Sequence, residues 1–209
     1  MKKLLLASDG PFLISQGYQL LGIPFDEVRI SYITTASKGA ENTDYLQRYK
    51  DAMQRDGLRF DEMDIEGKSR NELLDALEGK NVIHVEGGNT FYLLKAVKKT
   101  GFDEILKEKI LEGIHYFGTS AGAYIACPTI EMSTWGPATH DRYGLEDLTA
   151  LGLVPFLLKA HYTDDMEELM RERITQSRFP VRILRDGQGI FVDGDQYRFV
   201  GEGKEVVFI

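Results

Sequence analysis

The chain has 209 residues, of which 43% are hydrophobic and 28% charged, which is enough for one α/β domain over residues 1–209 with a sizeable core. The net charge of −8 and the lack of a basic block argue against nucleic acid or an anionic membrane as a partner. No apolar run reaches membrane-spanning length. The chain has a single cysteine, Cys127, so it cannot form an internal disulfide, and such low cysteine content is typical of proteins in a reducing cytoplasm.

The first half of the chain alternates predicted strands with predicted helices. Apolar patterns predict strands at 3–7, 26–34, 58–65, 81–85 and 114–117. Helical spacing and capping signals predict helices at 12–21, 45–55, 69–77, 90–98 and 102–113. The first apolar run ends at once in a Ser-Asp-Gly-Pro turn, which indicates a strand rather than a secretion signal. The alternation predicts right-handed βαβ units in a mostly parallel sheet with helices on both faces.

The pattern changes after residue 125. The segment 131–148 is rich in Gly, Pro and Thr and is expected to be a loop and a candidate lid. An apolar segment at 151–160 is followed by a charged helix at 164–176. From residue 181 short strands with tight turns are expected, with hairpins at 193–195 and 201–203.

A Gly-Thr-Ser-Ala-Gly motif at 118–122 joins a predicted strand to a short predicted helix. In that setting a G-x-S-x-G pattern indicates a nucleophile elbow, which predicts Ser120 as a nucleophile. The two glycines would let strand and helix approach closely while Ser120 takes a strained conformation with its Oγ exposed. The alternative is a glycine-rich turn whose serine only caps the helix.

A serine nucleophile requires a base within hydrogen-bond reach, and the chain has four histidines. His84 and His115 lie inside predicted strands and are expected to be core or interface residues. His140 lies in the 131–148 loop and is expected to be solvated. His161 follows an apolar segment, where a sheet edge is expected, and is the favoured base.

A third group has to orient the imidazole and stabilise its protonated form. Asp186 follows a short predicted strand, whereas Asp141 and Asp147 precede His161 in the chain. The order Ser, acid, His of an α/β-hydrolase would favour Asp141 or Asp147. An ordinary Asp-Gly turn would also account for Asp186, so the residues alone leave the acid open.

An oxyanion hole needs two N–H groups near the reacting carbonyl oxygen. The elbow places the N–H of Ala121 there, and Gly88, which follows a predicted strand, is the candidate for the second. The alternative for this turn is a helix start capped by Asn89. Cys127, weighed as a thiol nucleophile, falls inside a predicted helix and is expected to be a buried small apolar residue.

Four motifs together carry a family resemblance. They are Gly118-Thr119-Ser120-Ala121-Gly122-Ala123, Cys127-Pro128-Thr129-Ile130, Gly87-Gly88-Asn89-Thr90-Phe91 and His161-Tyr162-Thr163. In their order and spacing the chain resembles, over nearly its whole length, the serine-peptidase family of aspartyl dipeptidase (peptidase E) and cyanophycinase. The resemblance implies a flavodoxin-like α/β fold similar to class I glutamine amidotransferases, with a parallel sheet, a nucleophile elbow and C-terminal β-hairpins.

The resemblance also implies roles for individual residues. Ser120 would be the nucleophile, His161 the base, and Gly88 and Ala121 the oxyanion hole. The dipeptidase has a glutamate before a glycine in its C-terminal strand region, where this chain has Asp186 before glycine. Some family members are argued to take the acid from the loop after the elbow, but this chain has no acid at the matching place, which puts Asp186 ahead of Asp141.

The dipeptidase recognises an N-terminal aspartate, which requires a cation near the substrate carboxylate. Arg171 and Arg173 lie on the predicted helix after His161, and about 200° separates them around the helix, so only one can face a site. The alternative is a solvated face with an ion pair between Glu167 and Arg171.

These observations predict a cytoplasmic serine hydrolase that cleaves small peptides through an acyl-enzyme on Ser120, with N-terminal aspartate as the candidate specificity. We expect a monomer or homodimer that uses no cofactor and no metal. The alternatives are cyanophycinase-like cleavage of a β-aspartyl-arginine polymer and a non-catalytic binding protein that keeps the fold. A glutaminase subunit is disfavoured because that chemistry uses cysteine at the elbow.

Overall fold

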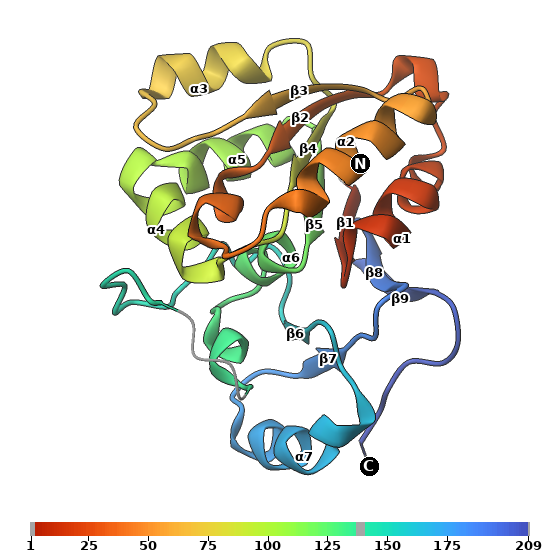
Figure 1. Cartoon of the computed structure of the whole chain (residues 1–209), viewed down its shortest axis with the longest axis vertical. Helices are drawn as coiled ribbons and strands as arrows, with labels where there is room; N and C mark the ends of the chain where they lie inside the picture. Colours follow the sequence, from red (N-terminus) through yellow and green to blue (C-terminus); the bar gives the residue numbers. More distant parts are fainter. Residues whose placement is uncertain (1–2, 137–140, 209) are drawn as a thin grey trace.

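The computed structural model of the chain describes residues 3–136 and 141–208. At its centre lies a seven-stranded sheet (Figure 1). In spatial order its strands are β3 (Arg59–Met63), β2 (Arg29–Ile33), β4 (Val82–Val85), β5 (His115–Thr119), β1 (Lys3–Ala7), β8 (Gln188–Asp193) and β9 (Gln196–Gly201). The first five run parallel, whereas β8 is antiparallel to β1 and β9 to β8. The predicted mostly parallel sheet is confirmed.

The strand order explains where a site can form. The chain adds β3 on one side of β2 and then β4 and β5 on the other, which is the reversal of a doubly wound sheet. In such sheets ligands bind beyond the carboxyl ends of the strands. Because β4, β5 and β1 are neighbours, the segments that follow them share one edge of the sheet.

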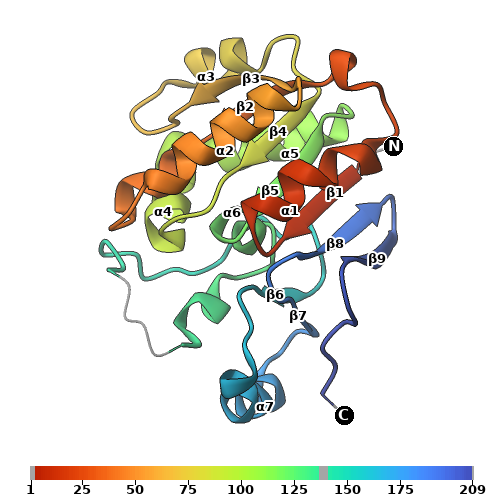
Figure 2. The ribbon, with the colours of Figure 1, turned by 45° about the vertical axis from the view of Figure 1, so that its right-hand side comes forward.

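Helices cover both faces of the sheet (Figures 1 and 2). One face carries α1 (Gly10–Ser15) and α2 (Asp44–Arg55), and the other α3 (Arg70–Leu77), α4 (Thr90–Thr100), α5 (Phe102–Leu111) and α6 (Ala121–Ile125). In β1, Leu5 and Ala7 belong to the core beneath α1 and α2, while Leu4 and Leu6 belong to the core on the other face. Successive strand side chains point to opposite faces, so a strand covered on both faces is a continuous apolar run.

Two predicted helices are each divided in the structure. The helix expected over 12–21 is α1 followed by a 3₁₀ helix, η1 (Gly17–Leu21). Gly17, the first residue of η1, lies close against β1, since a Cβ atom there would lie 2.5 Å from Cδ2 of Leu5. The helix expected over 164–176 is a 3₁₀ turn, η5 (Asp164–Met166), that leads into α7 (Glu167–Gln176), a common way for an α-helix to begin.

The C-terminal part adds a second, smaller sheet. Its strands β6 (Leu157–Lys159) and β7 (Val181–Ile183) pair in parallel, with α7 between them in the sequence. Within the described ranges, three further 3₁₀ helices lie in connections: η2 (Phe25–Glu27), η3 (Thr35–Gly39) and, inside the segment expected to be a loop, η4 (Glu131–Thr134).

The hairpin expected at 193–195 is confirmed, since it joins β8 to β9. The prediction of a second hairpin at 201–203 is wrong. A Cβ atom on Gly201, whose φ is 106°, would lie 2.2 Å from the carbonyl oxygen of Gly187. The backbone turns away at this close contact, and Val206 then forms a single bridge with Ile183.

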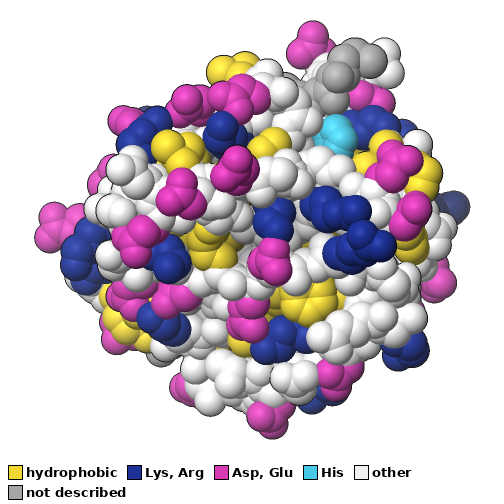
Figure 3. Space-filling model, turned by 90° about the horizontal axis from the view of Figure 1, so that it is seen from above, with side chains coloured by type: hydrophobic (Ala, Val, Ile, Leu, Met, Phe, Trp, Pro, Cys, Tyr) yellow, Lys and Arg dark blue, Asp and Glu magenta, His cyan; other side chains and the backbone are white. Residues whose placement is uncertain are grey.

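Among the described residues no helix has the length and apolar character needed to cross a membrane. On the face seen from above, acidic and basic side chains are interspersed with smaller hydrophobic areas (Figure 3).

Candidate active site

Ser120 lies at a sharp turn between β5 and α6, with φ 48° and ψ −105°. This backbone conformation is unfavourable for a residue with a side chain and has to be held by its surroundings. The N–H of Ser120 donates to the carbonyl oxygen of Ala7 at 3.0 Å, and its own carbonyl accepts from the N–H of Tyr124 at 2.9 Å. The strand–turn–helix geometry predicted for a nucleophile elbow is therefore present.

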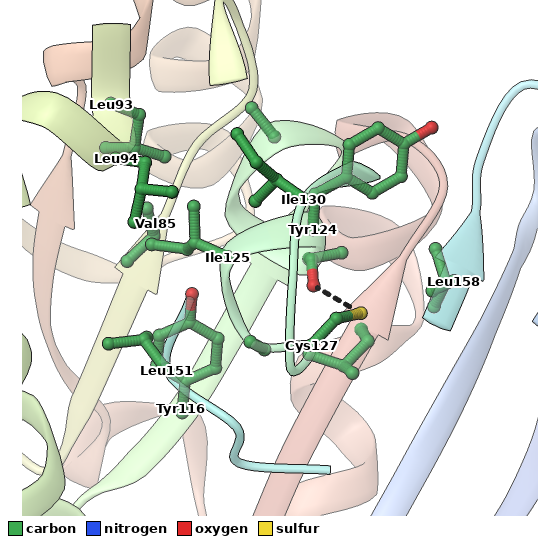
Figure 4. Packing of buried hydrophobic residues seen from close by; sticks show 14 of the residues in the cluster. Val85, Leu93, Leu94, Tyr116, Tyr124, Ile125, Cys127, Ile130, Leu151 and Leu158 are labelled. Carbon is green, nitrogen blue, oxygen red and sulfur yellow. Dashed lines mark hydrogen bonds between the residues drawn. The ribbon is translucent and has the colours of Figure 1, made fainter. Parts of the chain in front are cut away.

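Both glycines of the motif are required by close contacts. A Cβ atom on Gly118 would lie 2.6 Å from the carbonyl carbon of Gly122, and one on Gly122 would lie 2.0 Å from the carbonyl oxygen of Val85. Ile125 of α6, the short helix that follows Ser120, lies in one hydrophobic core with Val85 and Leu94 (Figure 4). The turn that carries Ser120 is therefore packed tightly against β4, β5 and the hydrophobic core.

His161 connects Ser120 to Asp186. Its Nε2 lies 3.0 Å from Oγ of Ser120, and its Nδ1 lies 2.6 Å from Oδ1 of Asp186. His161 follows β6 and Asp186 follows β7, so the parallel pairing of these two short strands brings the two residues together. The hydrogen bond expected between His161 and Asp186 is present.

Ser8, which follows β1, organises this pair and was not singled out from the sequence. Its Oγ accepts the backbone N–H of His161 and donates to Oδ1 of Asp186, both at 2.9 Å. The first bond holds His161 in a left-handed conformation, with φ 57°, that a histidine rarely adopts. The sequence feature that could have identified Ser8 is its position, since a serine directly after a parallel strand lies at the sheet edge where ligand sites form.

The hydrogen bond from His161 holds the pKa of Asp186 below its ordinary value. Asp186 is therefore a carboxylate at neutral pH and can stabilise a protonated imidazole. The competing acids are engaged elsewhere: the carboxylate of Asp141 accepts the N–H of Tyr143 at 2.8 Å, and Asp147 pairs with Lys98, which lowers the pKa of Asp147.

A cavity of about 180 Å³ opens beside Ser120, lined by residues that follow β1, β4 and β5, by two tyrosines of α2 and by His161. Gly88 belongs to this lining and has φ 141°, and a Cβ atom there would lie 2.4 Å from the carbonyl oxygen of Ala36. A Cβ atom on the preceding Gly87 would lie 3.2 Å from Cβ of Ser120. The structure therefore brings the Gly87-Gly88 turn against the serine. Convergence of the N–H groups of Gly88 and Ala121 on one oxyanion stays a prediction.

Two buried titratable groups lie in or directly after β4, and one of them, Glu86, belongs to the lining of the cavity. Glu86 is 1% exposed, and burial raises its pKa to about 7. Its carboxylate accepts the N–H of Gly87 at 2.7 Å and the hydroxyl of Tyr32 at 2.8 Å. His84 is fully buried with its pKa lowered to about 3, so it is a neutral core histidine, as expected. Glu86 was not recognised from the sequence, although an acid at the end of an apolar strand is itself unusual.

The arginines proposed to read the substrate do not reach the cavity. Arg171 and Arg173 lie on α7 and are absent from the described lining. Arg171 forms the expected ion pair with Glu167 at 2.9 Å, and its guanidinium lies 4.7 Å from the ring centre of Phe208.

The remaining candidate residues have other surroundings. Cys127 is buried, and burial raises its pKa to about 12, so its thiol is neutral and inaccessible, as expected. His115 is half-buried at the start of β5 and accepts the N–H of Lys3 at 3.3 Å. His140 lies outside the described residues. Within the described ranges no group of His, Cys, Asp and Glu side chains has the arrangement to hold a metal ion.

The chain is similar to known peptidases. The model of peptidase family S51 matches residues 19–200. An uncharacterized peptidase of Pasteurella multocida (strain Pm70) is 35% identical over 78% of this chain and 79% of that protein. Peptidase E of Streptomyces coelicolor is 30% identical over 78% of this chain and 68% of that protein. A crystal structure of a candidate peptidase E protein from Listeria monocytogenes EGD-e has a TM-score of 0.85 at 30% identity, covering 97% of this chain and 100% of that one.

Proposed function

The chain belongs to peptidase family S51 and is a serine-type peptidase, and we propose that it cleaves short peptides through an acyl-enzyme formed on Ser120. The observation that carries the proposal is the continuous hydrogen-bonded path from Oγ of Ser120 through His161 to Asp186. A cytoplasmic location is part of the proposal and is supported by the single, buried cysteine.

Each residue has a defined task in this reaction. Nε2 of His161 takes the proton of Ser120 as Oγ attacks the peptide carbonyl carbon, and Asp186 stabilises the resulting imidazolium. The N–H groups of Gly88 and Ala121 stabilise the oxyanion. When the C–N bond breaks, His161 returns the proton to the leaving amine. Water, deprotonated by His161, then releases the acyl group from Ser120.

The nucleophile can be tested directly. Ser120→Ala should lower kcat on the order of 10⁴-fold, because the acyl-enzyme can no longer form. Cys127→Ala is the matched control, since it removes the other candidate nucleophile and should leave kcat unchanged. Circular dichroism would confirm that both variants are folded. Activity retained in folded Ser120→Ala protein would contradict the proposal.

Short peptides are the proposed substrates, with N-terminal aspartate as the specificity to test. Asp9 and Glu86 are among the described lining residues of the cavity, whereas no lysine or arginine is. Recognition of an aspartate side chain would therefore need a cation from elsewhere in the chain or from a second subunit. Rates on Asp-X and Asn-X dipeptides decide this point: a strong preference for Asp-X supports the aspartyl specificity, and equal rates remove it while leaving the peptidase.

A further inference from the structure

The Gly87-Gly88 turn contains one peptide unit that lies between two fixed points. On one side the N–H of Gly87 donates to Oε1 of Glu86 at 2.7 Å, and on the other the N–H of Asn89 donates to the carbonyl oxygen of Ala36 at 2.9 Å. The unit between them consists of the carbonyl of Gly87 and the N–H of Gly88. Because neither glycine has a Cβ atom, sterics alone do not determine which way this unit faces.

Tyr45 holds this unit in one orientation. Its hydroxyl, on α2, donates to the carbonyl oxygen of Gly87 at 2.9 Å. The described chain has no cis peptide bond, so the carbonyl of Gly87 and the N–H of Gly88 point in opposite directions from one planar unit. A bond that fixes the carbonyl therefore fixes the direction of the N–H, and it also polarises that N–H as a donor.

We propose that Tyr45 is a positioning residue for the oxyanion hole, because its hydroxyl keeps the N–H of Gly88 turned toward the carbonyl oxygen of a substrate bound at Ser120. The inference rests on the proposed function, in which Gly88 supplies an oxyanion donor. If the unit flipped, the carbonyl oxygen of Gly87 would take the place of that N–H and repel the developing negative charge. Burial raises the pKa of Tyr45 above its ordinary value, so the hydroxyl stays a donor at neutral and mildly alkaline pH.

A tyrosine outside the cavity provides a matched control. Tyr92, on α4, is absent from the described lining of the cavity, and its hydroxyl donates to Oε2 of Glu66 at 2.8 Å. Tyr45→Phe and Tyr92→Phe therefore each remove one donated hydrogen bond, but only Tyr45→Phe frees the peptide unit between Gly87 and Gly88.

The kinetic test uses a short peptide and an activated ester with both variants. Loss of a whole oxyanion donor typically costs about 10²–10³ in kcat, so a donor that is only less well oriented should cost about tenfold. We expect Tyr45→Phe to lower kcat about tenfold on both substrates with little change in KM, and Tyr92→Phe to change neither. Wild-type kcat in Tyr45→Phe, an equal loss in both variants, or a loss confined to KM would overturn the proposal.

A structural test does not depend on activity. In crystal structures, the peptide unit between Gly87 and Gly88 should be flipped or in two orientations in Tyr45→Phe, and in a single, unchanged orientation in Tyr92→Phe. An unchanged single orientation in Tyr45→Phe would overturn the role of Tyr45. Failure of the proposed function has a different signature, which is activity retained by Ser120→Ala or no hydrolysis by the wild type.

Discussion

Replacement of Asp186 by asparagine tests the acid of the proposed triad. In the wild type Oδ1 of Asp186 accepts hydrogen bonds from both His161 and Ser8. An asparagine keeps the size of the side chain but removes its charge, and its NH₂ group can donate to Nδ1 of His161. That bond would place the imidazole proton on Nε2, and a protonated Nε2 cannot accept the proton of Ser120.

The size of the effect follows from the geometry. Opposite charges 2.6 Å apart attract by about 1.6 kcal/mol at the dielectric constant of water and about 6 kcal/mol at an effective value of about 20. The side chains of His161 and Asp186 are 49% and 63% exposed, so solvent screens the pair strongly. An intermediate value of about 3 kcal/mol corresponds to a loss of about 10² in kcat, smaller than the about 10⁴ found when a buried triad aspartate is changed to asparagine.

The assay is steady-state hydrolysis of a short peptide by purified variants whose folding is checked by circular dichroism. Asp186→Glu should recover part of the activity, because it restores the carboxylate. Asp141→Asn and Asp147→Asn are the controls and should retain wild-type kcat, since both carboxylates bind elsewhere. A crippling Asp141→Asn change together with a mild Asp186→Asn change would refute the assignment.

Three further predictions concern stability and reactivity. Burial raises the pKa of the Glu86 carboxyl from its ordinary 4.5 to about 7, so the folded state binds the carboxyl proton more tightly than the unfolded chain does. The free energy of unfolding of the wild type should therefore fall, on the order of 3 kcal/mol, as the pH rises through this interval. Glu86→Gln should lack this loss in urea unfolding at about pH 5 and about pH 8, and identical pH dependence in both proteins would count against it. Gly122→Ala should lower the free energy of unfolding by more than about 2 kcal/mol, because the new Cβ atom would overlap the carbonyl oxygen of Val85. Gly136→Ala is the control and should not lower it, because the space around Gly136 is open. Equal free energies of unfolding in the two variants would disprove the steric argument. Cys127 should react with a thiol reagent only after denaturation, and rapid labelling of the folded protein would show that its burial is wrong.

Local features of the sequence determined the elbow and the alternating core. Gly118 and Gly122 could be interpreted from the sequence because the requirement they meet is steric and acts over a few residues: a strand and a helix can approach this closely only without Cβ atoms. The strands and helices of the first half were predicted for the same reason, since an apolar period reports which face is buried. The neutral core role of His84 followed from its place inside such a strand.

Tertiary structure alone decided which acid joins His161. Three aspartates were compatible with the sequence, and the choice depends on β6 and β7, two strands of three residues each that carry too little pattern to predict their pairing. Their parallel alignment brings Asp186 to Nδ1 of His161, and Ser8, far away in the sequence, connects the two. Which residues meet across a sheet edge depends on strand order and register. These are set by how the whole core packs, and no local run of residues specifies them.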